Sequence, residues 1–72
     1  MLVERTERKI VLNGEPRTVS SATVAELLTE LNVAGKRVAV ELNRQVIARD
    51  NYPTMVISES DVVEVVQFVG GG

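Results

Sequence analysis

The chain contains no cysteine and no histidine among its 72 residues. These absences exclude a thiolate nucleophile, a disulfide, zinc and iron–sulfur ligand sets, and a general base that titrates near neutral pH. Carboxylates alone can still bind cations, but Asp50, Glu59 and Asp61 lack the oxygen spacing and turn glycine of a calcium loop, so we interpret them as turn residues. We therefore expect no catalytic residue, no metal site and no bound cofactor.

Basic residues and long apolar runs are also scarce. Eight Lys and Arg face ten Asp and Glu, which gives a net charge of −2, so no basic surface is expected for nucleic acid. No apolar run reaches membrane-spanning length, and there is no signal-peptide pattern. These features predict a cytoplasmic protein, monomeric when free, with no nucleic-acid and no membrane partner.

Aromatic residues make up only 3% of the chain, as Tyr52 and Phe68, whereas 44% of it is hydrophobic. The core must therefore consist of valine and leucine, and β-branched side chains favour strands. The length corresponds to one small domain covering residues 1–72.

The first twenty residues read as a hairpin. Residues 1–8 are a charged extension or the start of the first strand, and residues 10–12 are apolar. Asn13-Gly14 then predicts a type I′ turn, and residues 15–19 form the return strand. Pro16 cannot donate a ladder hydrogen bond, so the return strand is expected to lie at a sheet edge or to lack one ladder bond at this position.

A helix is predicted to begin at Thr23, because Glu26 follows three residues later as in a capping box. The apolar residues of this segment recur at helical spacing and share one face; they are Val24, Leu27, Leu28 and Leu31. Residues 32–35 end the helix, and Gly35 is the residue expected to take a left-handed conformation.

Strands dominate the second half. Residues 38–42 alternate apolar and polar, residues 46–47 form a short strand, and residues 58–61 form a polar turn. Residues 62–69 are a nearly continuous valine run, which predicts a central strand covered on both sides for part of its length.

One helix on one face of a mixed sheet of four to five strands is an α+β fold, and this order of elements predicts a β-grasp, or ubiquitin-like, roll. Strand alternation places Phe68, Val66 and Glu64 together on the face that should meet solvent or a partner. They are candidate docking residues, with a purely structural role as the alternative.

Three of the five glycines are Gly70, Gly71 and Gly72, directly after the last strand. Two interpretations stay open for them, an inert flexible tail and a reactive C-terminal end. Without side chains, Gly70 and Gly71 can thread a narrow active site and extend the Gly72 carboxylate roughly 10 Å beyond the folded body. A carboxylate that attacks the α-phosphate of ATP becomes a reactive acyl-adenylate. The chain holds no group that could promote this step, so it would be the substrate of an activating enzyme.

Four stretches carry a family resemblance: Ile-Val-Leu-Asn-Gly-Glu at 10–15, Val-Ala-Glu-Leu-Leu at 24–28, Val-Ala-Val-Glu-Leu-Asn at 38–43, and Asp-Val-Val-Glu-Val-Val at 61–66. With the glycine tail, they resemble ThiS-type sulfur carrier proteins of thiamine biosynthesis over residues 9–72. The family usually has glycine where this chain has Arg44 and Ser60.

The resemblance implies that Gly72 is adenylated by a ThiF- or MoeB-like enzyme that uses ATP. Sulfur from a cysteine desulfurase or a rhodanese-type donor then displaces AMP, and the resulting Gly72 thiocarboxylate supplies a ThiG-like thiazole synthase. The protein would be a stoichiometric co-substrate and not an enzyme. Three alternatives stay open: a MoaD-like small subunit of molybdopterin synthase, a ubiquitin-like protein modifier, and a binding module with an inert tail.

Overall fold

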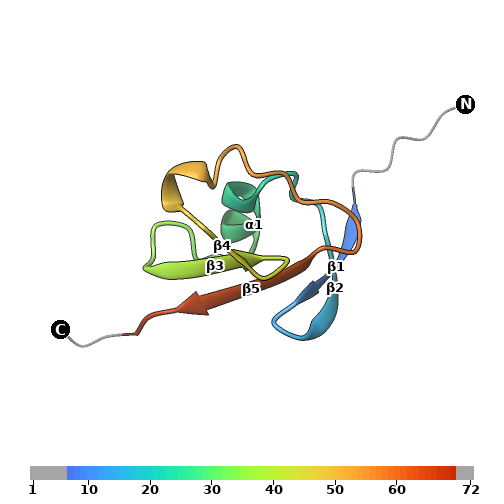
Figure 1. Ribbon diagram of the computed structural model, residues 1–72, viewed down its shortest axis with the longest axis horizontal. Coiled ribbons are helices and arrows are strands. Elements are labelled where there is room, and N and C mark those ends of the chain that lie inside the picture. The colour runs from blue at the N-terminus through green and yellow to red at the C-terminus, as the bar shows by residue number, and fades with distance from the viewer. Residues whose placement is uncertain (1–6, 70–72) are drawn as a thin grey trace, which may run out of the picture.

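The computed structural model describes residues 7–69 of the chain. They form a mixed five-stranded sheet in the order β2-β1-β5-β3-β4, with α1 on one face (Figure 1). Strand β1 runs parallel to β5, and the other neighbouring strands are antiparallel. The arrangement confirms the predicted α+β, β-grasp class. The elements are β1 (Arg8–Leu12), β2 (Glu15–Val19), α1 (Val24–Glu30), β3 (Val38–Leu42), β4 (Gln45–Ile47), the 3-10 helix η1 (Arg49–Asn51) and β5 (Val62–Gln67).

The first hairpin has the predicted geometry. Asn13 and Gly14 both adopt positive φ, at 50° and 83°, which is the requirement of a type I′ turn. Strand β2 lies at the edge of the sheet, as Pro16 predicted. The first strand begins at Arg8, so the end of the charged segment 1–8 belongs to the sheet.

The start of α1 is tied to the 52–55 segment. Thr23 Oγ1 accepts a hydrogen bond from the Glu26 N–H (3.2 Å), as predicted. The Glu26 carboxylate accepts from the Ala22 N–H (2.8 Å), one residue earlier than in a capping box. The N–H groups of the first two helical residues donate to the carbonyls of Met55 and Tyr52, each at 2.9 Å. The donors that a helix start leaves free are thus satisfied by tertiary contacts.

The helix ends at the predicted segment 32–35, and Gly35 has the predicted left-handed conformation, but the residue that terminates α1 is Asn32. Asn32 takes the left-handed conformation, at φ 63°, directly after the cap residue Leu31. Its N–H donates to the Thr29 carbonyl (3.0 Å), and the Val33 N–H donates to the Leu28 carbonyl (2.9 Å). This is a Schellman motif, which asparagine tolerates because its short polar side chain permits positive φ. Gly35, at φ 82°, belongs to the next turn.

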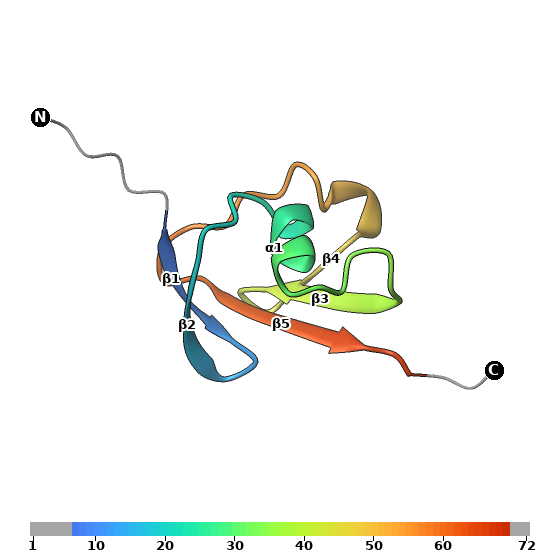
Figure 2. The ribbon, with the colours of Figure 1, turned by 180° about the vertical axis from the view of Figure 1, so that it is seen from behind.

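The core lies between α1 and one face of the sheet. Figures 1 and 2, from opposite sides, place α1 and the 49–57 segment on the same side of the strands. Tyr52 is the only aromatic residue in this core, which is otherwise aliphatic as the composition predicted. The buried hydrophobic residues are Ile10, Leu12, Val19, Val24, Leu27, Leu28, Val38, Val40, Leu42, Ile47, Tyr52, Ile57 and Val63.

Strand β5 is central, but the prediction that it is covered on both sides was wrong. Val63 is fully buried against the helix layer, while Val62 and Val66 are 43% and 54% exposed. The valine run is continuous because β-branched residues suit a strand with two neighbours, even where one face meets solvent. The strand also ends at Gln67 and not at Val69.

Two turns use left-handed residues other than glycine or asparagine. Arg44 and Ser60 both have φ of 71°, at the positions where glycine is usual in the family that the sequence resembles. A residue with a Cβ is strained in this conformation, because the left-handed region brings the Cβ close to the following carbonyl oxygen. The Ser60 N–H donates to the Lys9 carbonyl (2.7 Å), so this turn is joined to β1.

We predict that Ser60→Gly raises the free energy of unfolding by about 0.5–1 kcal/mol, because the relief of left-handed strain exceeds the entropy that glycine loses on folding. Ser58→Gly is the matched control in the same turn, since Ser58 has no positive φ. It should cost about 0.5–1 kcal/mol. Urea denaturation of both variants measures the difference. Equal effects of the two substitutions would show that the turn stores no strain.

Candidate functional site

The candidate docking residues lie on the uncovered side of the sheet. Val66 and Phe68 are 54% and 58% exposed, and Glu64 is also exposed. In the register of β3 with β5, Ala39 lies opposite Val66 and Glu41 lies opposite Glu64. We call the face formed by Val62, Glu64, Val66, Phe68, Ala39, Glu41 and Val46 the open face. The structure therefore brings the three predicted docking residues together on one exposed surface.

The open face is apolar with an acidic centre. Glu41 and Glu64 lie directly opposite each other on neighbouring strands, where side chains of like charge are unfavourable. Val46 and Val66 lie on either side, opposite Glu41 and Ala39. This arrangement contributes little to the stability of the free domain. It suits an apolar partner surface that brings a cationic group to the two carboxylates.

Asn13 holds one side of β5 with its side chain. Its amide nitrogen donates to the Val65 carbonyl (3.2 Å), and its amide oxygen accepts from the Val65 N–H (2.8 Å). Strand β1 itself pairs with β5 only at Val62 and Val63. The side-chain amide thus acts as one more peptide group and extends the ladder beyond the end of β1.

Asn43 holds the other side of β5 in a similar way. Its amide oxygen accepts from the Val62 N–H (2.9 Å), and its amide nitrogen donates to Asp61 Oδ1 (3.1 Å). Asp61 Oδ2 in turn accepts from the Ser58 N–H (2.7 Å). Asp61 is therefore a turn residue that bonds local backbone, as predicted.

These contacts determine how β5 leaves the domain. The Phe68 N–H donates to the Arg37 carbonyl (2.9 Å), so pairing with β3 continues past the end of the strand. The last described residue, Val69, is 88% exposed. The candidate residues Gly70, Gly71 and Gly72 lie outside the described residues. In the sequence they follow directly from this paired and exposed end of β5.

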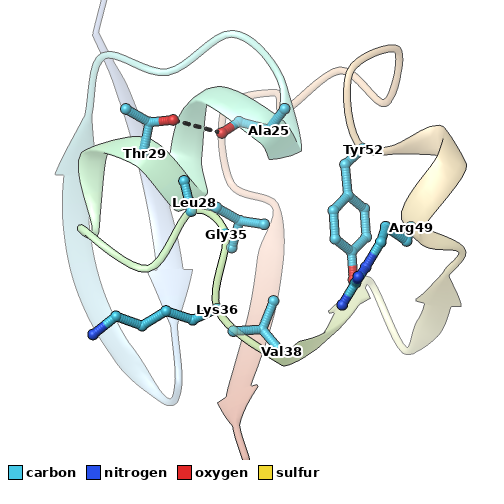
Figure 3. Close-up of a pocket in the computed structure, with 9 residues that line it drawn as sticks. Ala25, Leu28, Thr29, Gly35, Lys36, Val38, Arg49 and Tyr52 are labelled. Atoms are coloured by element: carbon cyan, nitrogen blue, oxygen red, sulfur yellow. Dashed lines mark hydrogen bonds between the residues drawn. The ribbon is translucent and has the colours of Figure 1, made fainter.

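A separate cavity of about 280 Å³ lies on the helix side of the sheet, between α1, the turn before β3, and Tyr52. Leu28 and Val38 line it, and Thr29 Oγ1 donates to the Ala25 carbonyl at 3.3 Å (Figure 3). Arg49 and Lys36 are its charged lining residues, and Lys36 directs its ammonium group away from Tyr52 (Figure 3). Of the predicted site residues that the structure describes, neither Phe68 nor Val66 nor Glu64 lines this cavity.

Within residues 7–69, no group of three His, Cys, Asp or Glu side chains is arranged to hold a metal ion. In the same part of the chain, no helix has the length and apolarity needed to cross a membrane. The acidic residues Asp50, Glu59 and Asp61 do not form such a group. Glu59 accepts from the Lys9 N–H (2.9 Å), which adds a contact between the 58–61 turn and β1.

Sequence reasoning missed the roles of Asn13 and Asn43. Asn13 has the left-handed φ expected of its turn, at 50°, and Asn43, in the turn between β3 and β4, has the same φ. Their side chains reach β5 across 52 and 19 residues of sequence. The signal available in the sequence was that each turn begins with asparagine, whose side chain carries both a donor and an acceptor.

Comparison with known proteins gives one consistent family. The model of the ThiS family matches residues 10–72. A protein of Thermus thermophilus named sulfur carrier protein ThiS is 43% identical over 61 residues, which cover 85% of this chain and 95% of that protein. The crystal structure of a thiamine biosynthesis protein (ThiS) from Geobacter metallireducens superimposes with a TM-score of 0.74 at 40% identity, covering 89% of this chain and 99% of that one.

Longer proteins match as well. A thiazole synthase of Magnetococcus marinus is 48% identical over 65 residues, and the match covers 89% of this chain. This chain spans only about a fifth of the length of that protein, as it does for a thiazole synthase of Paramagnetospirillum magneticum.

We predict that Asn13→Gly lowers the free energy of unfolding by about 1–2 kcal/mol. Glycine keeps the positive φ of the turn but removes both side-chain hydrogen bonds to Val65. Asn13→Ala should cost about 1 kcal/mol more, because alanine is also strained at this φ. Chemical denaturation of both variants measures the two effects. A stability of Asn13→Gly equal to that of the unaltered protein would contradict the role of the amide.

Proposed function

The chain belongs to the ThiS family, and from this membership we propose that it is a sulfur carrier of thiamine biosynthesis, with Gly72 as the residue that carries the sulfur. The observation that carries the proposal is the course of β5. This strand is central, is held on both sides by asparagine side chains, and leads into three residues without side chains. A firmly held strand followed by a slender tail suits delivery of a carboxylate into the active site of another protein.

The proposed chemistry has three steps. A Gly72 carboxylate oxygen attacks the α-phosphorus of ATP, pyrophosphate leaves, and an acyl-adenylate forms. The terminal sulfur of a persulfide attacks the acyl carbon and displaces AMP. A thiol then reduces the acyl disulfide, which leaves the Gly72 thiocarboxylate. Because the chain has no cysteine or histidine, the activating enzyme and the sulfur donor supply every catalytic group, and this protein acts as a co-substrate.

The partners follow from this chemistry. A ThiF- or MoeB-like enzyme supplies the ATP site, and a cysteine desulfurase or a rhodanese-type protein supplies the persulfide. We propose a thiazole synthase as the sulfur acceptor. The support is that two proteins named thiazole synthase each contain a segment, about a fifth of their length, that is similar to this chain. The relatives with thiamine names favour this pathway over a role as the small subunit of molybdopterin synthase or as a protein modifier. All these steps would take place in the cytoplasm.

The open face is the proposed docking surface for the activating enzyme. Val66 and Phe68 offer exposed apolar side chains close to the tail. Glu64 and Glu41 offer two carboxylates that a cationic side chain of the partner would neutralise. Docking on this face would hold the domain beside the adenylation site while the tail enters it.

We predict that incubation with ATP, a ThiF-like enzyme and a persulfide donor replaces one oxygen of the Gly72 carboxylate by sulfur. Tandem mass spectrometry should locate the change on the C-terminal peptide, and thiol alkylation should modify it. Location is essential, because oxidation of Met1 or Met55 changes the mass by almost the same amount.

Gly71→Val is the control for this experiment. Its β-branched side chain should obstruct a narrow channel without affecting the fold, so the mass change and the adenylate should both be lost. If the unaltered chain gives neither adenylate nor thiocarboxylate with two different activating enzymes, Gly72 is not the site of activation.

We predict that Val66→Lys lowers kcat/KM for adenylation by about 10-fold or more, because it replaces an apolar contact of the docking surface by a charged side chain. Val56→Lys is the matched control: Val56 is 60% exposed and belongs to the 49–57 segment on the helix side of the sheet, away from the open face. It should change kcat/KM by less than about 2-fold, as expected outside a contact. ATP–pyrophosphate exchange measures kcat/KM for both variants. Equal losses of kcat/KM in the two variants would show that the activating enzyme does not dock on the open face.

A further inference from the structure

Strand β5 presents its backbone to a different neighbour on each side. The Asn43 N–H donates to the Val62 carbonyl and the Phe68 N–H donates to the Arg37 carbonyl, so the even-numbered residues pair toward β3. The odd-numbered residues point toward β1, where the Val11 and Asn13 N–H groups donate to the Asp61 and Val63 carbonyls. Two separate ladders therefore hold the first half of the strand.

The β1 side of this ladder stops before the strand does. The register of β1 with β5 ends at Leu12 and Val63, and the Asn13 side chain adds one further rung at Val65. The next odd-numbered residue is Gln67, opposite the non-hydrogen-bonded position of Val38 in β3. Within residues 7–69, nothing bonds the Gln67 N–H or carbonyl. The second half of β5 is thus an open strand edge, visible beyond the β1–β2 hairpin (Figure 2).

The two outer edges of the sheet, formed by β2 and β4, differ from the open edge of β5. Strand β2 carries Pro16 between charged residues, and β4 is only three residues long. Proline, charge and short length all discourage pairing with another chain. Residues 65–69 read Val-Val-Gln-Phe-Val, with no charge and no proline. The half-edge beside the tail is therefore the one that lacks these protections.

We propose that an extended segment of the activating enzyme adds as a strand to this edge and pairs with the backbone of Gln67. The inference rests on the proposed function, and it names the contact that aims the tail. The Asn13 amide already shows which group fits this side of β5, since a carboxamide satisfies both the N–H and the carbonyl of Val65. A peptide group of the partner would do the same one rung further, about 6.6–6.8 Å along the strand.

This contact is distinct from docking on the open face. The side chains of Val66 and Phe68 stand out from the sheet, whereas the Gln67 N–H and carbonyl lie in its plane. Strand addition fixes the direction of β5 through backbone groups alone, and Gly70 follows only three residues after Gln67. The partner strand would therefore continue the sheet toward the glycines and set the path by which they enter the active site.

Amide hydrogen exchange followed by NMR tests the proposal without any substitution. In the free protein, the Gln67 N–H should exchange fast, while the Phe68 N–H, bonded to the Arg37 carbonyl, should be protected. In the complex with a ThiF-like enzyme and a non-hydrolysable ATP analogue, exchange at Gln67 should slow at least 10-fold. Unchanged fast exchange at Gln67 in this complex would overturn the proposal.

Gln67→Pro gives a second readout, because proline removes the N–H but not the β3 ladder. The variant should lower kcat/KM for adenylation by about 2- to 10-fold, the value of one hydrogen bond. Gln67→Ala keeps the N–H and should match the unaltered protein. An NMR spectrum of Gln67→Pro verifies that the sheet is intact, and normal adenylation of this folded variant would contradict strand addition. Failure of the unaltered chain to be adenylated would instead overturn the proposed function.

Discussion

The pairing of β5 with both of its neighbours is the constraint on which the rest of the structure depends. It joins the N-terminal hairpin to the β3–β4 hairpin, since β1 and β3 contact each other only through β5. Two asparagine side chains complete this pairing where the neighbouring strands turn away. Because the glycine tail follows β5 directly, the contacts that close the sheet also set the place from which the tail leaves the domain.

The two faces of the sheet contribute unequally to the stability of the domain. One face of the sheet is buried by a single helix and the 49–57 segment, and its core is aliphatic except for Tyr52. The other face exposes valines and places two glutamates opposite each other. Two turns also hold a residue other than glycine or asparagine in a left-handed conformation, at Arg44 and Ser60. A small domain has little stability in reserve, so an uncovered apolar face and unfavourable charge pair are consistent with selection for a contact with a partner.

The proposed function requires two kinds of contact with the activating enzyme. Side chains of the open face would hold the domain against its partner, and the backbone edge at Gln67 would aim the tail. Neither contact requires chemistry from this chain, whose composition offers no thiolate or imidazole. In this proposal the reactive group is the terminal carboxylate of Gly72, and the activating enzyme creates its reactivity. The protein would contribute a docking surface, the direction of β5 and three terminal residues without side chains.

The sequence by itself determined the local features. The Asn13-Gly14 turn, the apolar stripe of the helix and the alternation that exposes Phe68, Val66 and Glu64 depend on neighbouring residues, and all were predicted. Only the tertiary structure decided the features that depend on residues far apart in the sequence. It left one face of β5 uncovered, because the single helix packs on the other face of the sheet. It also brought the side chains of Asn13 and Asn43, which are distant in sequence, against β5. Periodicity reports which side chains share a face, but not whether another layer lies above it.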